Sequence, residues 1–123
     1  MTDKAYFFDS YAVVEMIKGN PNYMGYRKCE AVLTKLVLFE VYFKLIKEFA
    51  EADANKFLVE SYNLAVDFNP DVIKYAAKFR LDNMNKNLSM TDCIGYVLAK
   101  TLGIKFLTGD QQFRGVENVE FVK

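Results

Sequence analysis

Four carboxylates, widely spaced along the chain, are candidates for shared chemistry: Asp9, Glu40, Asp92 and Asp110. Asp9 directly follows a short apolar run, and Asp110 follows another by two residues. Carboxylate oxygens and water are the ligands that Mg²⁺ and Mn²⁺ prefer. Such an ion lowers the pKa of a bound water, stabilises charge on a phosphoryl oxygen and orients an in-line attack. These residue types therefore suit metal-dependent hydrolysis of a phosphodiester bond.

The chain contains no histidine. This excludes Ser-His-Asp and Cys-His catalysis and any zinc site that needs imidazole. The two cysteines, Cys29 and Cys93, lie in apolar segments without C-x-x-C spacing, so we expect reduced core thiols. Any metal must then be held by oxygen.

The length and composition favour one domain that covers residues 1–123. Hydrophobic residues make up 52% of the chain, which is enough to build a core. Sixteen basic and sixteen acidic residues cancel, so a polyanion would have to be bound by a local patch. The first residues lack the pattern of a secretion signal, and no charge-free apolar run approaches the ~18 residues of a membrane span. We therefore expect a soluble cytoplasmic protein without membrane contact.

Short apolar runs alternate with helical patterns along the chain. Strands are expected at 5–8, 31–34, 62–68, 104–108 and 119–122; helices are expected at 10–18, 22–29, 36–50, 54–61, 70–83 and 89–103, with one helical turn at 111–113. Strands that alternate with helices predict an α/β fold, a three-layer α/β/α sandwich around a mainly parallel sheet of four to five strands.

Local signals support several of these helices. The helix expected at 36–50 carries one polar stripe, which consists of Glu40, Lys44, Lys47 and Glu51. Because the rest of that helix is apolar, we expect most of it to be buried. Asp53 can cap the following helix, and Asn69 with Pro70 marks a strong helix start. The segment 89–92 fits a capping box, and Gly103 is expected to end that helix.

Ligands of such sheets bind beyond the carboxyl ends of the strands. Asp9 and Asp110 would share that edge if the strands before them are parallel. Each acid also has a structural interpretation: Asp9 as a helix cap, Asp92 as a capping-box acid, Asp110 as a turn residue, and Glu40 as the partner of Lys44. Carboxylates crowded into one cleft would repel each other, and a divalent cation would remove that conflict.

Three parts of the sequence resemble PIN-domain ribonucleases. Residues 88–92, the helix up to Gly103 and residues 106–113 are similar to the C-terminal signature of that family, and this is the most specific part. Residues 6–10 resemble its opening strand, which ends in Asp followed by Ser or Thr, and Phe39-Glu40 resembles its helical Glu. The similarity spans nearly the whole chain.

The resemblance implies a PIN-like fold and a Mg²⁺- or Mn²⁺-dependent endonuclease that acts on single-stranded RNA or RNA loops. It implies that the catalytic and metal-binding residues are Asp9, Glu40, Asp92 and Asp110, and that Ser10 and Thr108 supply hydroxyls beside them. It also implies a homodimer. Small members are often toxins of VapBC-type pairs, which an antitoxin protein holds inactive.

One departure from the family concerns the residues after Asp110. Many members carry a further acid there, whereas this chain has Gln111 and Gln112. Loss of that acid would weaken metal binding or limit the site to one ion. The alternative function is therefore a catalytically silent PIN-like module that binds RNA or a partner protein. A phosphoacceptor domain is disfavoured because no second acid accompanies Asp9.

Basic residues near the expected cleft are candidates for contacts with RNA phosphates. They are Arg80, Lys86 and Arg114. Arg114 follows Asp110 by four residues, so it is expected near the mouth of the cleft. The competing interpretation is ordinary solvated surface charge, which is the usual state of Lys and Arg.

Overall fold

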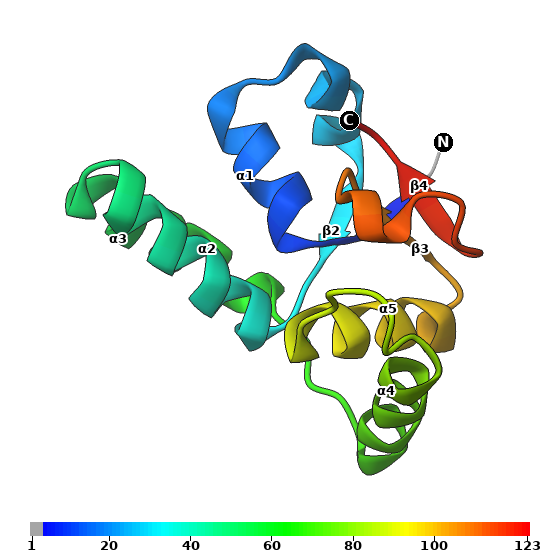
Figure 1. The fold of residues 1–123 in the computed structure, drawn as a ribbon. Helices are drawn as coiled ribbons and strands as arrows, with labels where there is room; N and C mark the ends of the chain where they lie inside the picture. Colours follow the sequence, from blue (N-terminus) through cyan, green and yellow to red (C-terminus); the bar gives the residue numbers. More distant parts are fainter. Residues whose placement is uncertain (1–3) are drawn as a thin grey trace.

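A parallel sheet forms the centre of the molecule (Figure 1). The computed structural model describes residues 4–123. The strands are β1 (Ala5–Phe8), β2 (Glu30–Val32), β3 (Lys105–Thr108) and β4 (Val119–Phe121). Their order is β2-β1-β3-β4, and each neighbouring pair is parallel. The expected α/β/α class with a sheet of four to five strands is confirmed, with four strands.

Helices cover both faces of this sheet. They are α1 (Ser10–Lys18), α2 (Lys35–Glu48), α3 (Glu51–Ser61), α4 (Pro70–Asp82) and α5 (Met90–Leu102), together with the 3₁₀ helices η1 (Pro21–Lys28), η2 (Tyr62–Leu64) and η3 (Gln111–Phe113). On one side α1 contacts β1, β3 and α2, while on the other side α5 contacts β1 and β3 and carries α4 on its outer surface (Figure 1). No helix within residues 4–123 is long and apolar enough to cross a membrane.

The central strand β1 supplies side chains to both helical layers. Phe7 faces α5 and stacks on Phe106 with ring centroids 5.7 Å apart. Gly95 of α5 makes room for this pair, because a Cβ there would lie 2.6 Å from a Phe7 ring carbon. Tyr6 faces η1, where its ring packs edge-on against Tyr26 at 5.3 Å. Burial on both faces explains why the strand is a continuous apolar run.

The helix signals in the sequence act as expected at several ends. The Asn69 side chain accepts a 3.2 Å hydrogen bond from the Val72 amide. Ser89 Oγ accepts from the Asp92 amide at 3.0 Å, and Asp92 Oδ2 accepts from the Ser89 amide at 2.9 Å, which completes the capping box. Gly103 ends α5 in the left-handed conformation, with φ of 72°. These bonds fix the start of the helix that carries Asp92.

The strand expected at 62–68 does not form. This stretch begins with η2 and contributes a single parallel bridge, between Ala65 and Leu33. One further hydrogen bond joins the Val66 amide to the Leu33 carbonyl at 2.8 Å. The chain then turns to Asn69, which caps α4. A short, mostly apolar segment such as 62–68 matches both a strand and a segment that packs along a sheet edge, so periodicity alone did not separate them.

The expectation that α2 is mostly buried is also wrong. Its buried residues are Val37, Leu38, Val41 and Leu45. In contrast, Phe39 is 73% exposed and Phe43 is 54% exposed. Because α2 packs mainly on α1 and α3 instead of on the sheet, one apolar stripe is sufficient for its contacts. Leu36 and Tyr42 are half-buried against the core, whereas Phe39, Phe43 and Ile46 face solvent.

Two smaller expectations also change. Asp53 does not cap α3, because that helix begins at Glu51 and has Ala50 at its N-cap without a side-chain capping bond. The helix expected at 22–29 is the 3₁₀ helix η1, which starts at Pro21. Asn20 caps it by accepting a 2.9 Å hydrogen bond from the Asn22 amide.

Candidate functional site

Asp9 lies at the carboxyl end of β1 and is only 2% exposed. Its Oδ2 accepts a 2.8 Å hydrogen bond from the hydroxyl of Thr108, at the end of the adjacent parallel strand β3. Its Oδ1 is buried and has no hydrogen-bond partner among residues 4–123. The side chain makes no capping bond to α1, so the interpretation of Asp9 as a helix cap does not account for it. A buried carboxylate oxygen without a partner is unfavourable unless a cation, a proton or water satisfies it.

Thr108 also holds the backbone of Asp110. Its hydroxyl accepts a 3.1 Å hydrogen bond from the Asp110 amide. Asp110 Oδ1 in turn accepts from the Gln112 amide at 3.0 Å and caps η3. Gly109 is required between them, because a Cβ there would collide with the Val122 carbonyl oxygen. The interpretation of Asp110 as a turn residue is thus correct, and the same turn sets its carboxylate at the carboxyl edge of the sheet.

Glu40 reaches the same region from α2. Ser10, the first residue of α1, donates a 2.9 Å hydrogen bond from its hydroxyl to Glu40 Oε1. Within the described part of the chain, Glu40 forms no ion pair with Lys44, although this pairing was one interpretation of the sequence. The Ser10 bond therefore ties α2 to the end of β1.

These side chains meet in one pocket of about 380 Å³. It is lined by Ser10, Phe39, Glu40, Phe43, Lys44, Ser89, Asp92 and Asp110. Asp9 is buried beside Ser10 and lies close enough to Asp92 and Glu40 for their charges to act on it. The structure therefore brings together all four carboxylates that the sequence singled out.

The electrostatics of the cluster reflect crowded acids. Burial, followed by the charge of Asp92, raises the pKa of Asp9 to about 7, while the Thr108 hydroxyl and the Ser10 backbone amide partly oppose the shift. The pKa of Asp92 is also raised, chiefly by burial and further by Glu40 and Asp110, although its bonds to Ser89 oppose this. Burial and like charge both disfavour the ionised forms. The pocket consequently favours a proton or a cation.

The carboxylate oxygens of the site suit a hard divalent ion, but among the described residues they do not form a complete coordination shell. Within residues 4–123, no three metal-binding side chains converge closely enough to form a ready coordination shell. Mg²⁺ does not need such a shell, because it commonly keeps several waters and takes one or two carboxylates. The unpartnered Oδ1 of Asp9 and the raised pKa of Asp92 are consistent with a binding mode of this kind.

The basic residues singled out in the sequence do not line this pocket. The Nε of Arg114 donates to Gln111 Oε1 at 2.9 Å, and its guanidinium lies 4.5 Å from the centroid of the Phe121 ring. The Nζ of Lys86 donates to the Gln112 carbonyl at 3.1 Å. Both residues therefore brace the segment after Asp110.

Arg80 is exposed on α4. The basic residue that does line the pocket is Lys44, a member of the polar stripe predicted on helix α2. Its position four residues after Glu40 was the available signal, because that spacing puts two residues on one face of a helix. Nothing in the sequence indicated that Phe39 and Phe43 line this pocket, because the apolar residues of their helix were expected in the core.

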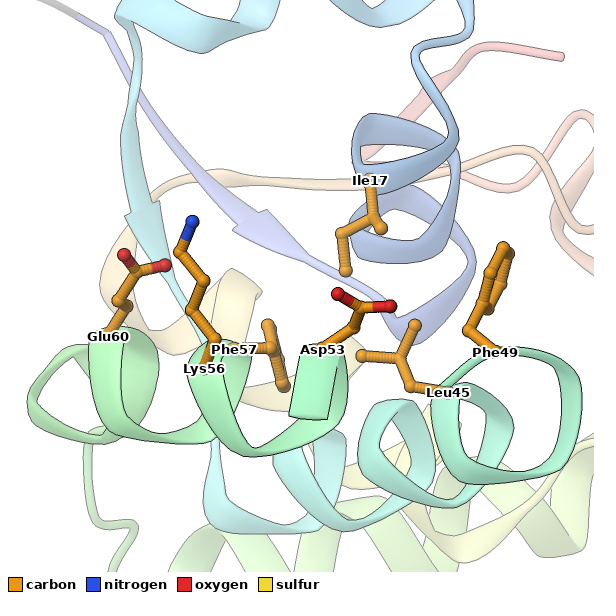
Figure 2. A pocket seen from close by; sticks show the side chains of 7 residues that line it. All are labelled: Ile17, Leu45, Phe49, Asp53, Lys56, Phe57 and Glu60. Atoms are coloured by element: carbon orange, nitrogen blue, oxygen red, sulfur yellow. The ribbon is translucent and has the colours of Figure 1, made fainter. Parts of the chain in front are cut away.

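A second pocket, of about 410 Å³, lies between α1, α2 and α3 (Figure 2). Ile17, Leu45 and Phe49 point into it, and Asp53 lies between them (Figure 2). Lys56, Phe57 and Glu60 of α3 complete its lining. It contains none of the four clustered carboxylates, so the two pockets are chemically distinct.

The parallel sheet, its two helical layers and the acids at the ends of β1 and β3 define an α/β/α domain with an acidic site at the carboxyl edge. A family model of the PIN domain matches residues 6–119, and the chain belongs to this family. The resemblance inferred from the sequence is confirmed. No curated protein sequence gives a significant match.

Solved structures share the fold at low sequence identity. A toxin-antitoxin complex from Klebsiella pneumoniae has a TM-score of 0.73 and 13% identity, covering 94% of this chain and 95% of that one. VapBC2 from Rickettsia felis, bound to a promoter DNA fragment, has a TM-score of 0.71 and 15% identity, covering 97% and 99%. The Mycobacterium tuberculosis toxin VapC20, described as cleaving the sarcin-ricin loop, has a TM-score of 0.76 and 15% identity, covering 96% and 99%.

Proposed function

We propose that this protein is a Mg²⁺- or Mn²⁺-dependent endoribonuclease. The observation that carries the proposal is the unpartnered, buried Oδ1 of Asp9 inside a group of four carboxylates at the sheet edge of a PIN domain. Membership of this family supports a nuclease role. The structural neighbour described as cleaving the sarcin-ricin loop supports RNA as the substrate.

Asp9, Glu40, Asp92 and Asp110 would hold the ion. When bound, a divalent ion supplies an activated water and stabilises charge on the phosphoryl oxygen. The hydroxyl of Thr108 orients the Asp9 carboxylate and the Asp110 backbone together, and Ser10 orients Glu40. These three hydrogen bonds keep the donor oxygens in place before a substrate arrives.

Lys44 is the basic side chain at the pocket wall and would contact the phosphate next to the scissile bond. Arg80, Lys86 and Arg114 would contact phosphates further along the strand. Lys86 and Arg114 already bond to the segment after Asp110, so RNA binding there would compete with these contacts.

A second candidate function is a silent module that binds RNA or a partner protein through the same pocket. Two observations favour it. No ready three-ligand shell exists within residues 4–123. In addition, Gln112 Oε1 accepts a 3.0 Å hydrogen bond from the Asn87 amide, so this side chain has a structural role in place of a further acid.

We also propose that the protein is the toxin of a toxin-antitoxin pair, acts on RNA in the cytoplasm and forms a homodimer. The neighbours support the toxin assignment, since they include a toxin-antitoxin complex and VapBC2. Co-expression with a small adjacent reading frame should yield a stable complex that lacks RNase activity. Sedimentation of the protein alone should give twice the mass of one chain.

The test of the nuclease is RNA cleavage with Mn²⁺ by the parent protein, Asp9→Asn and Asp53→Asn. Asp53 is an acid of the second pocket and provides the matched control. The parent and Asp53→Asn should cleave, whereas Asp9→Asn and the parent with a chelator should not. RNA binding without metal-dependent cleavage would identify the silent module.

Thermal unfolding provides a measurement that does not depend on knowing the substrate. Millimolar Mn²⁺ should raise the Tm of the parent by mass action, and the increase should be much smaller for Asp9→Asn. An unchanged melting curve of the parent would contradict the metal site.

A further inference from the structure

Helix α2 presents two exposed aromatic side chains to the acidic pocket. Phe39 is 73% exposed and Phe43 is 54% exposed, and both line the pocket that contains the carboxylates. Their spacing of four residues places them side by side on one face of the helix. Other phenylalanines of the chain, such as Phe7 and Phe106, are completely buried. Phe39 and Phe43 are thus exposed aromatic side chains that line the pocket containing the carboxylates.

A polar pair runs beside this aromatic pair. Glu40 and Lys44 are each one residue further along α2 and line the same pocket. Consecutive helical residues are rotated by about 100°, so the two pairs form adjacent rows along the helix. One row carries charge and the other carries flat apolar rings, and both border a single pocket.

A single-stranded nucleic acid has the complementary chemistry. Each nucleotide joins a charged phosphate to a flat base, and unpaired bases stack on aromatic side chains of proteins. We propose that Phe39 and Phe43 form a base-stacking platform that makes the site selective for unpaired nucleotides. This inference rests on the proposed function and specifies which RNA segments the site accepts.

The pocket lining favours a nucleotide over an apolar peptide as the occupant. Besides the two phenylalanines, the pocket is lined by charged or hydroxyl side chains: Ser10, Glu40, Lys44, Ser89, Asp92 and Asp110. An apolar peptide would leave these groups desolvated without partners, which is unfavourable. In a base-paired duplex both faces of each base are already stacked, so the platform would have no free ring to contact.

The test measures how strongly the protein distinguishes bases. The parent protein in chelator, where the proposed nuclease does not cleave, is titrated with labelled oligoadenylate, oligouridylate and an abasic ribose-phosphate chain, each about 12 nucleotides long. Oligoadenylate should bind at least about fivefold more tightly than the abasic chain, the low end of the range for stacking one base. Adding Phe39→Leu and Phe43→Leu should remove this difference, because leucine keeps the apolar volume and lacks the ring.

Two controls separate stacking from a general effect on structure. Phe39→Tyr keeps a ring and should retain the preference for oligoadenylate. Phe49→Leu changes an exposed phenylalanine that lines the second pocket, and it should have no effect. In the otherwise wild-type protein, the double leucine variant should raise the KM for single-stranded RNA at least about fivefold with little change in kcat. It should retain the Mn²⁺-induced increase in Tm.

Each failure has a distinct meaning. The stacking platform is wrong if the parent protein binds all three oligonucleotide chains equally, or if the double leucine variant keeps the preference for oligoadenylate. Neither result contradicts the proposed nuclease. The same holds if the leucine variant cleaves normally but no longer dimerises or binds a co-expressed partner, which would assign the rings to a protein contact. If the protein neither binds nor cleaves RNA, the platform and the proposed function are both wrong.

Discussion

Replacing Asp9 with Asn should stabilise the metal-free protein at about pH 8, even though it removes a residue of the site. In the folded protein, burial and the charge of Asp92 raise the pKa of Asp9 from an ordinary 3.8 to about 7. Each pKa unit corresponds to about 1.4 kcal/mol, so the ionised side chain destabilises the fold by at most about 4 kcal/mol.

The expected net gain is smaller than this limit. The Asn carbonyl oxygen can still accept the hydrogen bond from Thr108. Its NH₂ group would then occupy the place of Oδ1, which has no partner, at a cost of about 1–3 kcal/mol. A net stabilisation of about 1–3 kcal/mol remains, which corresponds to a Tm increase of about 3–10 °C for a chain of this length.

The pH dependence gives the sign of the effect. Because the folded-state pKa of Asp9 is raised, the folded protein binds a proton more tightly than the unfolded chain does between about pH 4 and pH 7. The parent therefore loses stability from this group as the pH rises through that range. Below about pH 4 the Asp9 carboxyl is protonated in the folded and unfolded states, so only the cost of the unpartnered NH₂ group remains and Asp9→Asn should be less stable than the parent by about 1–3 kcal/mol. As the pH rises, the difference should change sign, and it should reach a plateau above about pH 7.

The assay is denaturant unfolding of both proteins in chelator at several pH values, with Asp53→Asn as an exposed-acid control. A lower stability of Asp9→Asn at about pH 8 would refute the reasoning, since it would mean that the ionised carboxylate is well accommodated. A difference that does not change with pH would refute it as well.

Three further substitutions test the packing and bonding around the site. Gly95→Ala should destabilise the fold by about 1–3 kcal/mol in denaturant unfolding, because its methyl group would lie 2.6 Å from an aromatic ring of β1. Ser89→Ala should lower stability by about 1 kcal/mol through loss of the cap on the Asp92 amide, and a weaker effect of Mn²⁺ on Tm should accompany it. Thr108→Val should raise the pKa of Asp9 further by removing its hydrogen bond, which carboxylate NMR titration would detect as a shift to higher pH.

Those parts of the fold that depend on local chemistry were predictable from the sequence. The helix α1 matches its expected bounds, 10–18, because Gly19 ends it in the left-handed conformation. The start of α5 follows from its capping box. In both cases the signal and the structure lie within a few residues, so no distant contact could override them.

The errors concern segments whose structure depends on distant neighbours. The apolar run at 62–68 forms one bridge to Leu33 instead of a strand, because its neighbour in space is a sheet edge where it makes few bonds. Helix α2 has apolar residues on several sides, and only its packing on α1 and α3 decides which of them are buried. Periodicity describes the helix itself and contains no information on how many faces are covered.

The amino-acid types, their places in the expected strands and helices, and the resemblance to PIN-domain ribonucleases were sufficient to single out Asp9, Glu40, Asp92 and Asp110, and the absence of histidine excluded imidazole chemistry. Tertiary structure decided that Glu40, Asp92 and Asp110 line one pocket with Asp9 buried beside it, that Asp9 Oδ1 has no hydrogen-bond partner among residues 4–123, and that Phe39 stands exposed beside Glu40. The physical reason is that burial and electrostatic coupling depend on groups that lie far apart in the sequence. Asp9 and Thr108, which are joined by a hydrogen bond, are separated by 99 positions along the chain. Parallel pairing of β1 with β3 brings these groups together, and it is established only when the whole sheet forms.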